Sequence, residues 1–242
     1  MHSIFRYLLV AVALAFAGAA LGGAHVNPVR IDVDASGRGV ITLTHVGERR
    51  ATYQVTPYAW SILANDDALE PTAEFIASPA AVTLEPGQAR TIRVGFRNPQ
   101  RAAKERTFRL LVRELPDAQP LPPDTIAIAT VLELSIPVFI APAKPVPGEL
   151  AWSLRAHEGA LVLRAENSGA QHVQVRGISL TPPGAAASLA SRELRYVLAG
   201  TVREWRFPAP ASKLAGGAWR LTATTGRGPV TAELAGPLQP AQ

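Results

Sequence analysis

A long alternating apolar segment constrains this chain more than any other part of its sequence. Residues 124–142 read DTIAIATVLELSIPVFIAP. Their aliphatic side chains fall on even positions, at Ile126, Ile128, Leu132, Leu134, Ile136 and Val138. This alternation is typical of a β-strand, and it runs for about 13 residues where ordinary strands have about 5–6. Such a segment must enter a sheet, and part of it must extend past its neighbours.

The simplest interpretation is a central strand whose even face lies in the core of its own domain. Three features argue against it for the whole segment. The odd face is not very polar, the segment is longer than its neighbours, and Pro137 lacks the backbone N–H that a central strand requires. Long apolar edge strands are normally avoided because they recruit other chains. We therefore expect binding by β-augmentation, in which main-chain hydrogen bonds give affinity and alternate side chains fill a partner's groove.

The rest of the chain predicts an all-β protein, because turn signals recur every 8–12 residues without helical periodicity. We expect strands at 29–33, 40–44, 52–60, 75–82, 91–96, 107–113, 149–154, 160–167, 173–180, 195–198, 202–207 and 219–224. Residues 64–67 and 181–190 are interpreted as loops. The predicted units are a first sandwich domain at 25–142, a stiff Pro-rich linker at 143–148, a second at 149–235 and a flexible tail at 236–242.

The N-terminal segment predicts export. MHSIFRY is followed by the apolar stretch LLVAVALAFAGAALGGA, which ends in small residues suited to cleavage, so residues 1–24 are interpreted as a signal peptide. The alternative is a membrane anchor, but the apolar run of about 15–18 residues is short for a spanning helix of about 20. No later segment is apolar enough to span a membrane.

Composition excludes several classes of function. Cys 0 rules out disulfides and thiolate chemistry, so an exported chain like this must rely on core packing. The net charge is +5, but the basic residues are dispersed and lack interleaved aromatics, which argues against nucleic acid and favours acidic protein partners or an anionic membrane surface. No two histidines have metal-ligand spacing, and neither a nucleophile elbow nor a P-loop is present. We expect no catalytic residues and no metal site.

Three blocks of sequence, taken in order, resemble a known family. They are NPVRI at 27–31, FIASPAAVTLEPGQARTIRV at 75–94 and KERTFRLLVRELP at 104–116, followed by a Pro-rich loop and the long alternating strand. Together they resemble the periplasmic pilus-assembly chaperones of the chaperone–usher pathway, over nearly all of the mature chain. The loop Pro116–Asp124 is short, as in the short-loop or archaic type of this family.

The resemblance implies two immunoglobulin-like β-sandwich domains at an angle and a location in the periplasm. It implies pilus or fimbrial subunits as partners, delivered to an outer-membrane usher, with no cofactor. A subunit lacks its last strand, and the chaperone lends its own strand by donor-strand complementation. Alignment on Val138–Pro142 places the donor residues at Ile126, Ile128, Thr130 and Leu132, where Thr130 departs from the family's bulky aliphatic residue. The remainder, 134–139, is expected to dock the strand into its own domain.

The family also holds the subunit's C-terminal carboxylate in the inter-domain cleft with an arginine and a lysine. Arg30 matches the arginine by position, and a guanidinium can bind a carboxylate bidentately, although an ordinary surface arginine is the alternative. Pro137 occupies the lysine's position. Lys144 in the linker is a candidate substitute; otherwise it is solvated, and Arg30 acts alone or with backbone N–H groups. The family's arginine before the linker proline is Ala141 here, whereas Glu105, in its partner region, is retained.

Two other functions fit an exported β protein. An immunoglobulin-like adhesin or structural surface protein is one, but it would not need Arg30 and an edge strand at the same cleft. A hydrolase assembled from distant residues is the other, and no motif in the sequence supports it.

Overall fold

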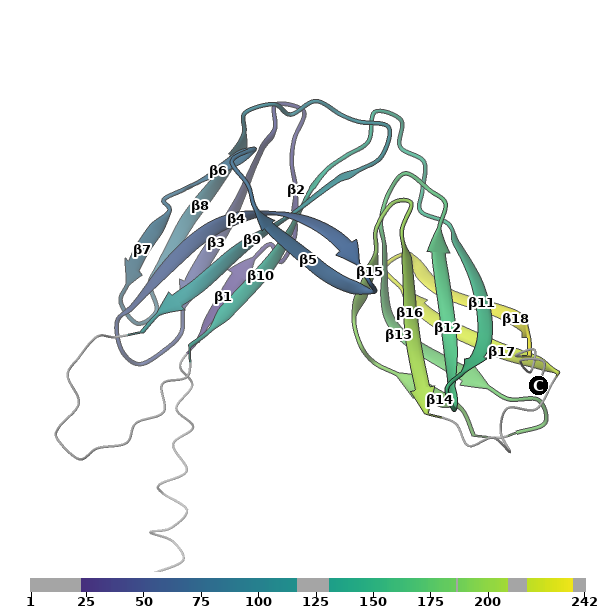
Figure 1. The fold of residues 1–242 in the computed structure, drawn as a ribbon. Coiled ribbons are helices and arrows are strands. Elements are labelled where there is room, and N and C mark those ends of the chain that lie inside the picture. Colours follow the sequence, from purple (N-terminus) through teal and green to yellow (C-terminus); the bar gives the residue numbers. More distant parts are fainter. Residues whose placement is uncertain (1–22, 117–130, 186, 209–216, 237–242) are drawn as a thin grey trace, which may run out of the picture.

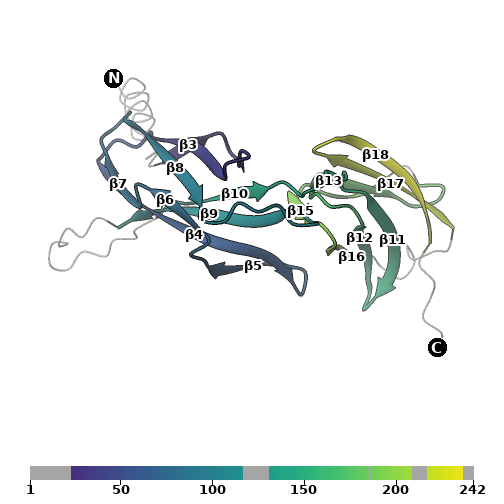
Figure 2. The ribbon, with the colours of Figure 1, turned by 90° about the horizontal axis from the view of Figure 1, so that it is seen from above.

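The structure, a computed structural model of the 242-residue chain, describes residues 23–116, 131–185, 187–208 and 217–236. All regular secondary structure in these ranges is β-strand. The strands form two sandwiches that meet at an angle (Figure 1). Viewed from above, the sandwiches lie end to end (Figure 2). The predicted all-β architecture is confirmed. The predicted signal peptide and tail lie outside the described residues, except for Gly23, Ala24 and Gly236.

The first domain contains strands β1 to β10. Their bounds are β1 (Ala24–Asn27), β2 (Ile31–Asp32), β3 (Arg38–His45), β4 (Ala51–Leu63), β5 (Asp66–Pro71), β6 (Phe75–Ser78), β7 (Ala81–Leu84), β8 (Ala89–Phe96), β9 (Arg106–Leu115) and β10 (Glu133–Ile140). One sheet has the order β1-β3-β8-β6, and the other has the order β2-β10-β9-β4-β5, with β7 also paired to β4. Alternate side chains from both sheets fill the core, including Ile41, Leu43, Ile92, Val94, Tyr53, Val55, Leu110 and Val112.

The second domain contains strands β11 to β18. Their bounds are β11 (Leu150–His157), β12 (Ala160–Asn167), β13 (Val173–Thr181), β14 (Leu189–Ser191), β15 (Arg195–Val197), β16 (Val202–Pro208), β17 (Ala218–Thr225) and β18 (Gly228–Ala235). A sheet of order β11-β12-β16 packs against one of order β14-β13-β17-β18, in which β15 also pairs with β13. Its separate core centres on Trp205, Trp219 and their aliphatic neighbours.

The observed strands differ from the predicted ones in several places. β1 was not predicted, and the predicted strand 29–33 is reduced to β2. The predicted strand 75–82 is divided into β6 and β7 around Pro79, whose missing N–H cannot continue a ladder. The predicted loop at 64–67 is correct for Ala64 and Asn65, which form a two-residue turn with positive φ angles of 48° and 74°. It is wrong for the next two residues, because β5 begins at Asp66. β14 falls partly in the predicted loop 181–190, and β18 was not predicted.

β10 is the described part of the long alternating segment, and its even row belongs to the domain core. Ile136, Val138 and Ile140 are each at most 2% exposed, and Leu134 packs partly against the same core. Burial of an aliphatic side chain of this size contributes about 1.5–3 kcal/mol. For this half of the segment, the simple interpretation of an inward-facing even row is correct, and it fixes the strand firmly in its domain.

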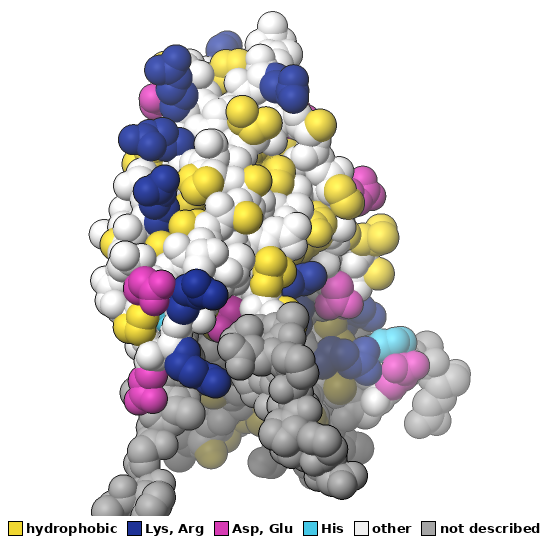
Figure 3. Space-filling model, turned by 90° about the vertical axis from the view of Figure 1, so that its left-hand side faces the viewer, with side chains coloured by type: hydrophobic (Ala, Val, Ile, Leu, Met, Phe, Trp, Pro, Cys, Tyr) yellow, Lys and Arg dark blue, Asp and Glu magenta, His cyan; other side chains and the backbone are white. Residues whose placement is uncertain are grey.

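Positive charge also lies far from the junction of the domains. On the outer face of the first domain, Lys and Arg side chains gather along one margin, with apolar side chains scattered beside them (Figure 3). Val40 and Ile76, both more than half exposed, belong to the four-stranded sheet of this domain. Basic character alone therefore does not identify a binding site on this molecule.

The packing of β10 gives a stability prediction. Ile136→Ala removes a fully buried side chain and should lower the free energy of unfolding by about 2–5 kcal/mol. Val40→Ala, on the exposed face of β3, is the matched control and should change it by less than about 0.5 kcal/mol. Urea unfolding measures both, and equal effects of the two substitutions would contradict the assigned orientation of β10.

Candidate partner-binding site

The candidate site begins with the incomplete pairing of β10. Along one side, β10 pairs with β9 over its whole length, from Glu133↔Arg113 to Ile140↔Arg106. On the other side, β2 pairs in parallel with Val138 and Phe139 alone. No other described strand pairs with β10, so Glu133–Pro137 form an open strand edge. We call this stretch the free edge.

Hydrogen bonds show which backbone groups point outward at the free edge. The carbonyl of Leu132 accepts from the Glu114 N–H (2.8 Å), so even residues bond to β9. Odd residues of an antiparallel strand then point their backbone groups the other way, and the carbonyl of Phe139 accordingly accepts from Val33 N–H on the β2 side (3.0 Å). Pro137 belongs to this odd set, so its missing N–H breaks no bond to β9.

The predicted donor residues are only partly visible. Leu132 is half-buried and directly precedes β10. Ile126, Ile128 and Thr130 lie outside the described residues. Their roles therefore stay predictions, and the observed strand shows only that the same even register leads into the core.

The predicted anchor residues lie in two different segments. Arg30 is exposed just before β2, and its Nη2 and Nε lie 2.7 and 2.9 Å from the Asp32 carboxylate. Asp32 stands in register with Phe139, so Arg30 is beside the C-terminal end of β10. Lys144 is an exposed linker residue, and no described residue forms an ion pair with it. Neither side chain is held in the interior of a domain.

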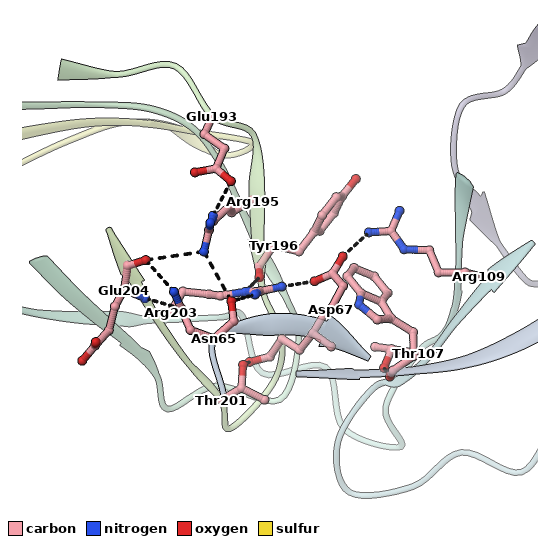
Figure 4. A network of polar contacts seen from close by, with 12 residues as sticks. Asn65, Asp67, Thr107, Arg109, Glu193, Arg195, Tyr196, Thr201, Arg203 and Glu204 are labelled. Atoms are coloured by element: carbon pink, nitrogen blue, oxygen red, sulfur yellow. Dashed lines mark hydrogen bonds and ion pairs between the residues drawn. The ribbon is translucent and has the colours of Figure 1, made fainter. Parts of the chain in front are cut away.

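The two domains meet at a polar network around the β4–β5 hairpin (Figure 4). At the hairpin turn, the side-chain amide of Asn65 donates to the Glu204 carbonyl (3.0 Å) and accepts from the Glu204 N–H (2.7 Å). Arg203 donates to the Asn65 carbonyl and to the Asp67 carboxylate. Asp67 also pairs with Arg109 of β9 (3.2 Å), so one carboxylate joins arginines of both domains.

Arg109 is the structural centre of this network. It is the cross-strand neighbour of Pro137, and its side chain is only 11% exposed. Its guanidinium lies 3.7 Å from the centroid of the Trp60 ring and donates to the Ser135 carbonyl (3.3 Å). Burial lowers the pKa of Arg109, and the charge of Asp67 acts in the opposite direction. All of these contacts fix Arg109 inside the protein.

Aromatic rings complete the junction. Trp60 and Phe139 from the first domain pack with Tyr196 and Leu198 from the second in one buried cluster. His172 stacks on Phe139 with ring centroids 4.0 Å apart. A cleft of about 350 Å³ opens beside these rings, lined by residues of both domains including Arg109 and Tyr196.

Glu105 of the first domain bonds to the second domain. Its buried carboxylate accepts from the His172 backbone N–H (2.9 Å) and lies 2.7 Å from His172 Nδ1. Its own backbone N–H donates to the Ala170 carbonyl (2.8 Å). The junction is thus held without the arginine that Ala141 replaces.

Sequence reasoning missed the residues that join the domains: Trp60, Asp67, Arg109, Tyr196 and Arg203. A usable signal existed only for the hairpin, because Asn readily adopts the positive φ that a two-residue turn demands. The partners of the hairpin lie about 130–140 residues away in the chain, as for Arg195 and Arg203, so no local pattern could indicate them.

Among the described residues, no group of His, Asp and Glu side chains could hold a metal ion. In the part of the chain that the structure describes, no helix is long and apolar enough to cross a membrane.

The free edge and the cleft beside it define a class of protein, namely one with two β-sandwich domains that binds a second chain by extending its own sheet. Residues 23–145 match the family described as "Pili and flagellar-assembly chaperone, PapD N-terminal domain". The chain belongs to this family of pilus-assembly chaperones, whose members work in the periplasm.

Solved structures of the same architecture include a chaperone in a chaperone–tip adhesion subunit complex from the archaic Csu pili of Acinetobacter baumannii. It is 18% identical, covers 88% of this chain and 98% of its own, and has a TM-score of 0.63. A match in a complex of the Salmonella enterica SafA pilin with the SafB chaperone is 16% identical, covering 88% and 97%, with a TM-score of 0.61. The Escherichia coli chaperone DraB is 17% identical, covering 90% and 99%, with a TM-score of 0.56. A sequence search of curated proteins gives no match.

The arginine network predicts how the junction responds to loss of its shared carboxylate. Asp67→Asn leaves Arg109 and Arg203 without their counter-charge and should lower the free energy of unfolding by about 1–3 kcal/mol. It should also broaden the distribution of distances between spin labels placed one in each domain. Asp66→Asn, at the adjacent exposed residue, is the control. An Asp67→Asn protein with unchanged stability and distances would show that this network does not hold the domains.

Proposed function

We propose that this protein is a periplasmic chaperone that captures pilus subunits by donor-strand complementation and passes them to an outer-membrane usher. The observation that carries the proposal is the free edge of β10, which is anchored by its core side chains and unpaired on its outer side. An incomplete sandwich can add its own edge there through backbone hydrogen bonds.

The proposed donor face is Ile126, Ile128, Thr130 and Leu132. These residues continue the even register of Leu134 and Ile136, which point into the first domain's own core. The even side chains at the C-terminal end of this strand pack in the first domain's own core. The even side chains at its N-terminal end can pack in the open core of a partner. Each buried aliphatic side chain is worth about 1.5–3 kcal/mol before ordering costs, so three of them can supply a substantial part of the affinity.

Arg30 is the proposed ligand for the subunit's C-terminal carboxylate. It is exposed beside the C-terminal end of β10, and its positive charge acts on Tyr196, which lines the cleft between the domains. Asp32 holds two of its nitrogens and so orients the guanidinium. Lys144 is less suited, because no described contact orients its side chain.

The remaining parts of the proposal follow from the family. The chain would be exported through residues 1–24, which are removed, and would fold in the periplasm as the two domains 25–142 and 149–235. It acts by binding alone, without catalysis or a cofactor, and its partners are subunits and usher rather than nucleic acid. The structures of relatives bound to an adhesion subunit and to a pilin support this role.

Substitution of Arg30 tests the anchor. Arg30→Ala should abolish capture of a pilus subunit co-expressed from the same chaperone–usher gene cluster, because the subunit's terminal carboxylate loses its charged hydrogen bonds. Affinity purification from periplasm measures the captured subunit. Arg93→Ala, an exposed arginine of β8, should capture normally, and both variants should unfold like the parent protein. Normal capture by Arg30→Ala would remove Arg30 from the site.

Charges on the donor face test the strand. The double substitution Ile128→Asp with Leu132→Asp should block subunit capture while leaving the monomer's thermal unfolding unchanged, because carboxylates cannot enter a partner's apolar groove. Ile76→Asp, which places the same charge on the exposed face of β6, should have no effect on capture. If the double variant fails to fold, residues 128 and 132 belong to this chain's own core and the donor assignment is wrong.

A further inference from the structure

The second domain presents an arginine to the junction that no acidic group occupies. Arg176 is exposed on β13, and no described carboxylate forms an ion pair with it. Its Nε donates to the Gln174 side-chain carbonyl (2.8 Å), which leaves its two terminal amino groups without a described partner. In contrast, the guanidinium groups of Arg109 and Arg203 both form ion pairs with Asp67.

A β-bulge in β13 sets the direction of the Arg176 side chain. The register between β13 and β17 shifts between Val175 and Gly177, so Arg176 has no cross-strand partner on β17. A bulge of this kind turns one side chain away from its regular direction, and bulges are frequent beside binding sites. Gln174 lies two residues earlier, where β13 pairs regularly with Tyr196 of β15. Its side-chain carbonyl accepts from Arg176 Nε and so holds the arginine side chain in place.

A chain of contacts connects Arg176 with Arg30. The Gln174 side-chain N–H donates to the Tyr196 hydroxyl (2.8 Å), and the Tyr196 ring packs on Phe139 with centroids 6.0 Å apart. Phe139 pairs in register with Asp32, which binds Arg30. The two arginines thus approach the same aromatic cluster from different domains.

The electrostatics of Tyr196 agree with this placement. Burial raises the pKa of the phenol, and the positive charges of Arg109, Arg30 and Arg176 act in the opposite direction. All three charges therefore lie near the Tyr196 hydroxyl. Arg109 is paired and nearly buried. Arg30 and Arg176 are exposed, and each keeps at least one terminal amino group without a described partner, so these two can bind an anion from solution.

We propose that Arg176 supplies the second positive charge for the terminal carboxylate of a captured subunit, opposite Arg30 and across the domain junction. The inference rests on the proposed function. It accounts for Pro137, because a lysine in that position is unnecessary when the second cation comes from β13. It also makes subunit binding depend on the relative position of the domains, since Arg30 and Arg176 belong to different ones.

Arg109 is the competing candidate because it neighbours Pro137 on the adjacent strand. Its guanidinium is nevertheless covered by Trp60, bound to Asp67 and nearly buried. A carboxylate could reach it only by displacing Asp67, which would also release Arg203. The exposed and unpaired Arg176 needs no such rearrangement.

The test uses the full chain and two peptides that match the last ten residues of a captured subunit, one with a free C-terminal carboxylate and one with a C-terminal amide. The parent protein should bind the carboxylate form about tenfold more tightly than the amide form, as expected for a charged hydrogen bond. Arg176→Gln should remove most of this preference. Arg220→Gln, an exposed arginine of β17 in the same domain, should keep it.

Each outcome decides a separate question. If Arg176→Gln keeps the full carboxylate preference while Arg30→Gln loses it, Arg176 is not a ligand and the inference is overturned, although the proposed function stands. If the parent protein captures the subunit but does not distinguish the peptides, the cleft binds no carboxylate and the inference is again overturned. If the parent protein captures no subunit, the proposed function fails and the inference fails with it. Thermal unfolding of Arg176→Gln confirms that its fold is intact.

Discussion

The one-sided pairing of β10 is the constraint on which the rest of this structure depends. Its even side chains pack in the core of the first domain and hold the strand there. On its other side, β2 pairs only with Val138 and Phe139. An open edge of this kind invites self-association. Two features of the edge typically discourage such pairing: Pro137, and the charged residue Glu133, which forms an ion pair with Arg113 of β9 (2.6 Å). The edge is thus kept open for a partner that contributes matching apolar side chains.

Contacts at the domain junction fix the position of the second domain relative to this edge. Asp67 joins arginines of both domains, Glu105 bonds to His172, and Phe139 at the end of β10 packs with Tyr196. The strand that binds a partner is therefore also part of the junction. A partner on the free edge would contact both domains, and its affinity would depend on an angle that these contacts set.

The sequence predicted much of the fold because alternation and turn residues are local properties. The ranges 160–167, 173–180 and 202–207 match β12, β13 and β16 within one residue, and the expected docking of 134–139 into the first domain is confirmed for its even residues. The hairpin of β4 and β5 was missed because its turn contains neither Gly nor Pro. The arginine network and the placement of Arg176 depend on contacts between distant segments and on a bulge, and no spacing in the sequence encodes these.

Hydrogen–deuterium exchange of the β10 amides tests the central claim most directly. Glu133 and Ser135 belong to the odd set whose N–H groups point to the free edge, whereas Leu134 and Ile136 bond to β9. In the isolated protein, the amides of Glu133 and Ser135 should exchange fast and those of Leu134 and Ile136 slowly. A bound subunit should slow exchange at Glu133 and Ser135 by at least about tenfold. If the subunit binds and the exchange of these two amides does not change, the partner does not add a strand to β10.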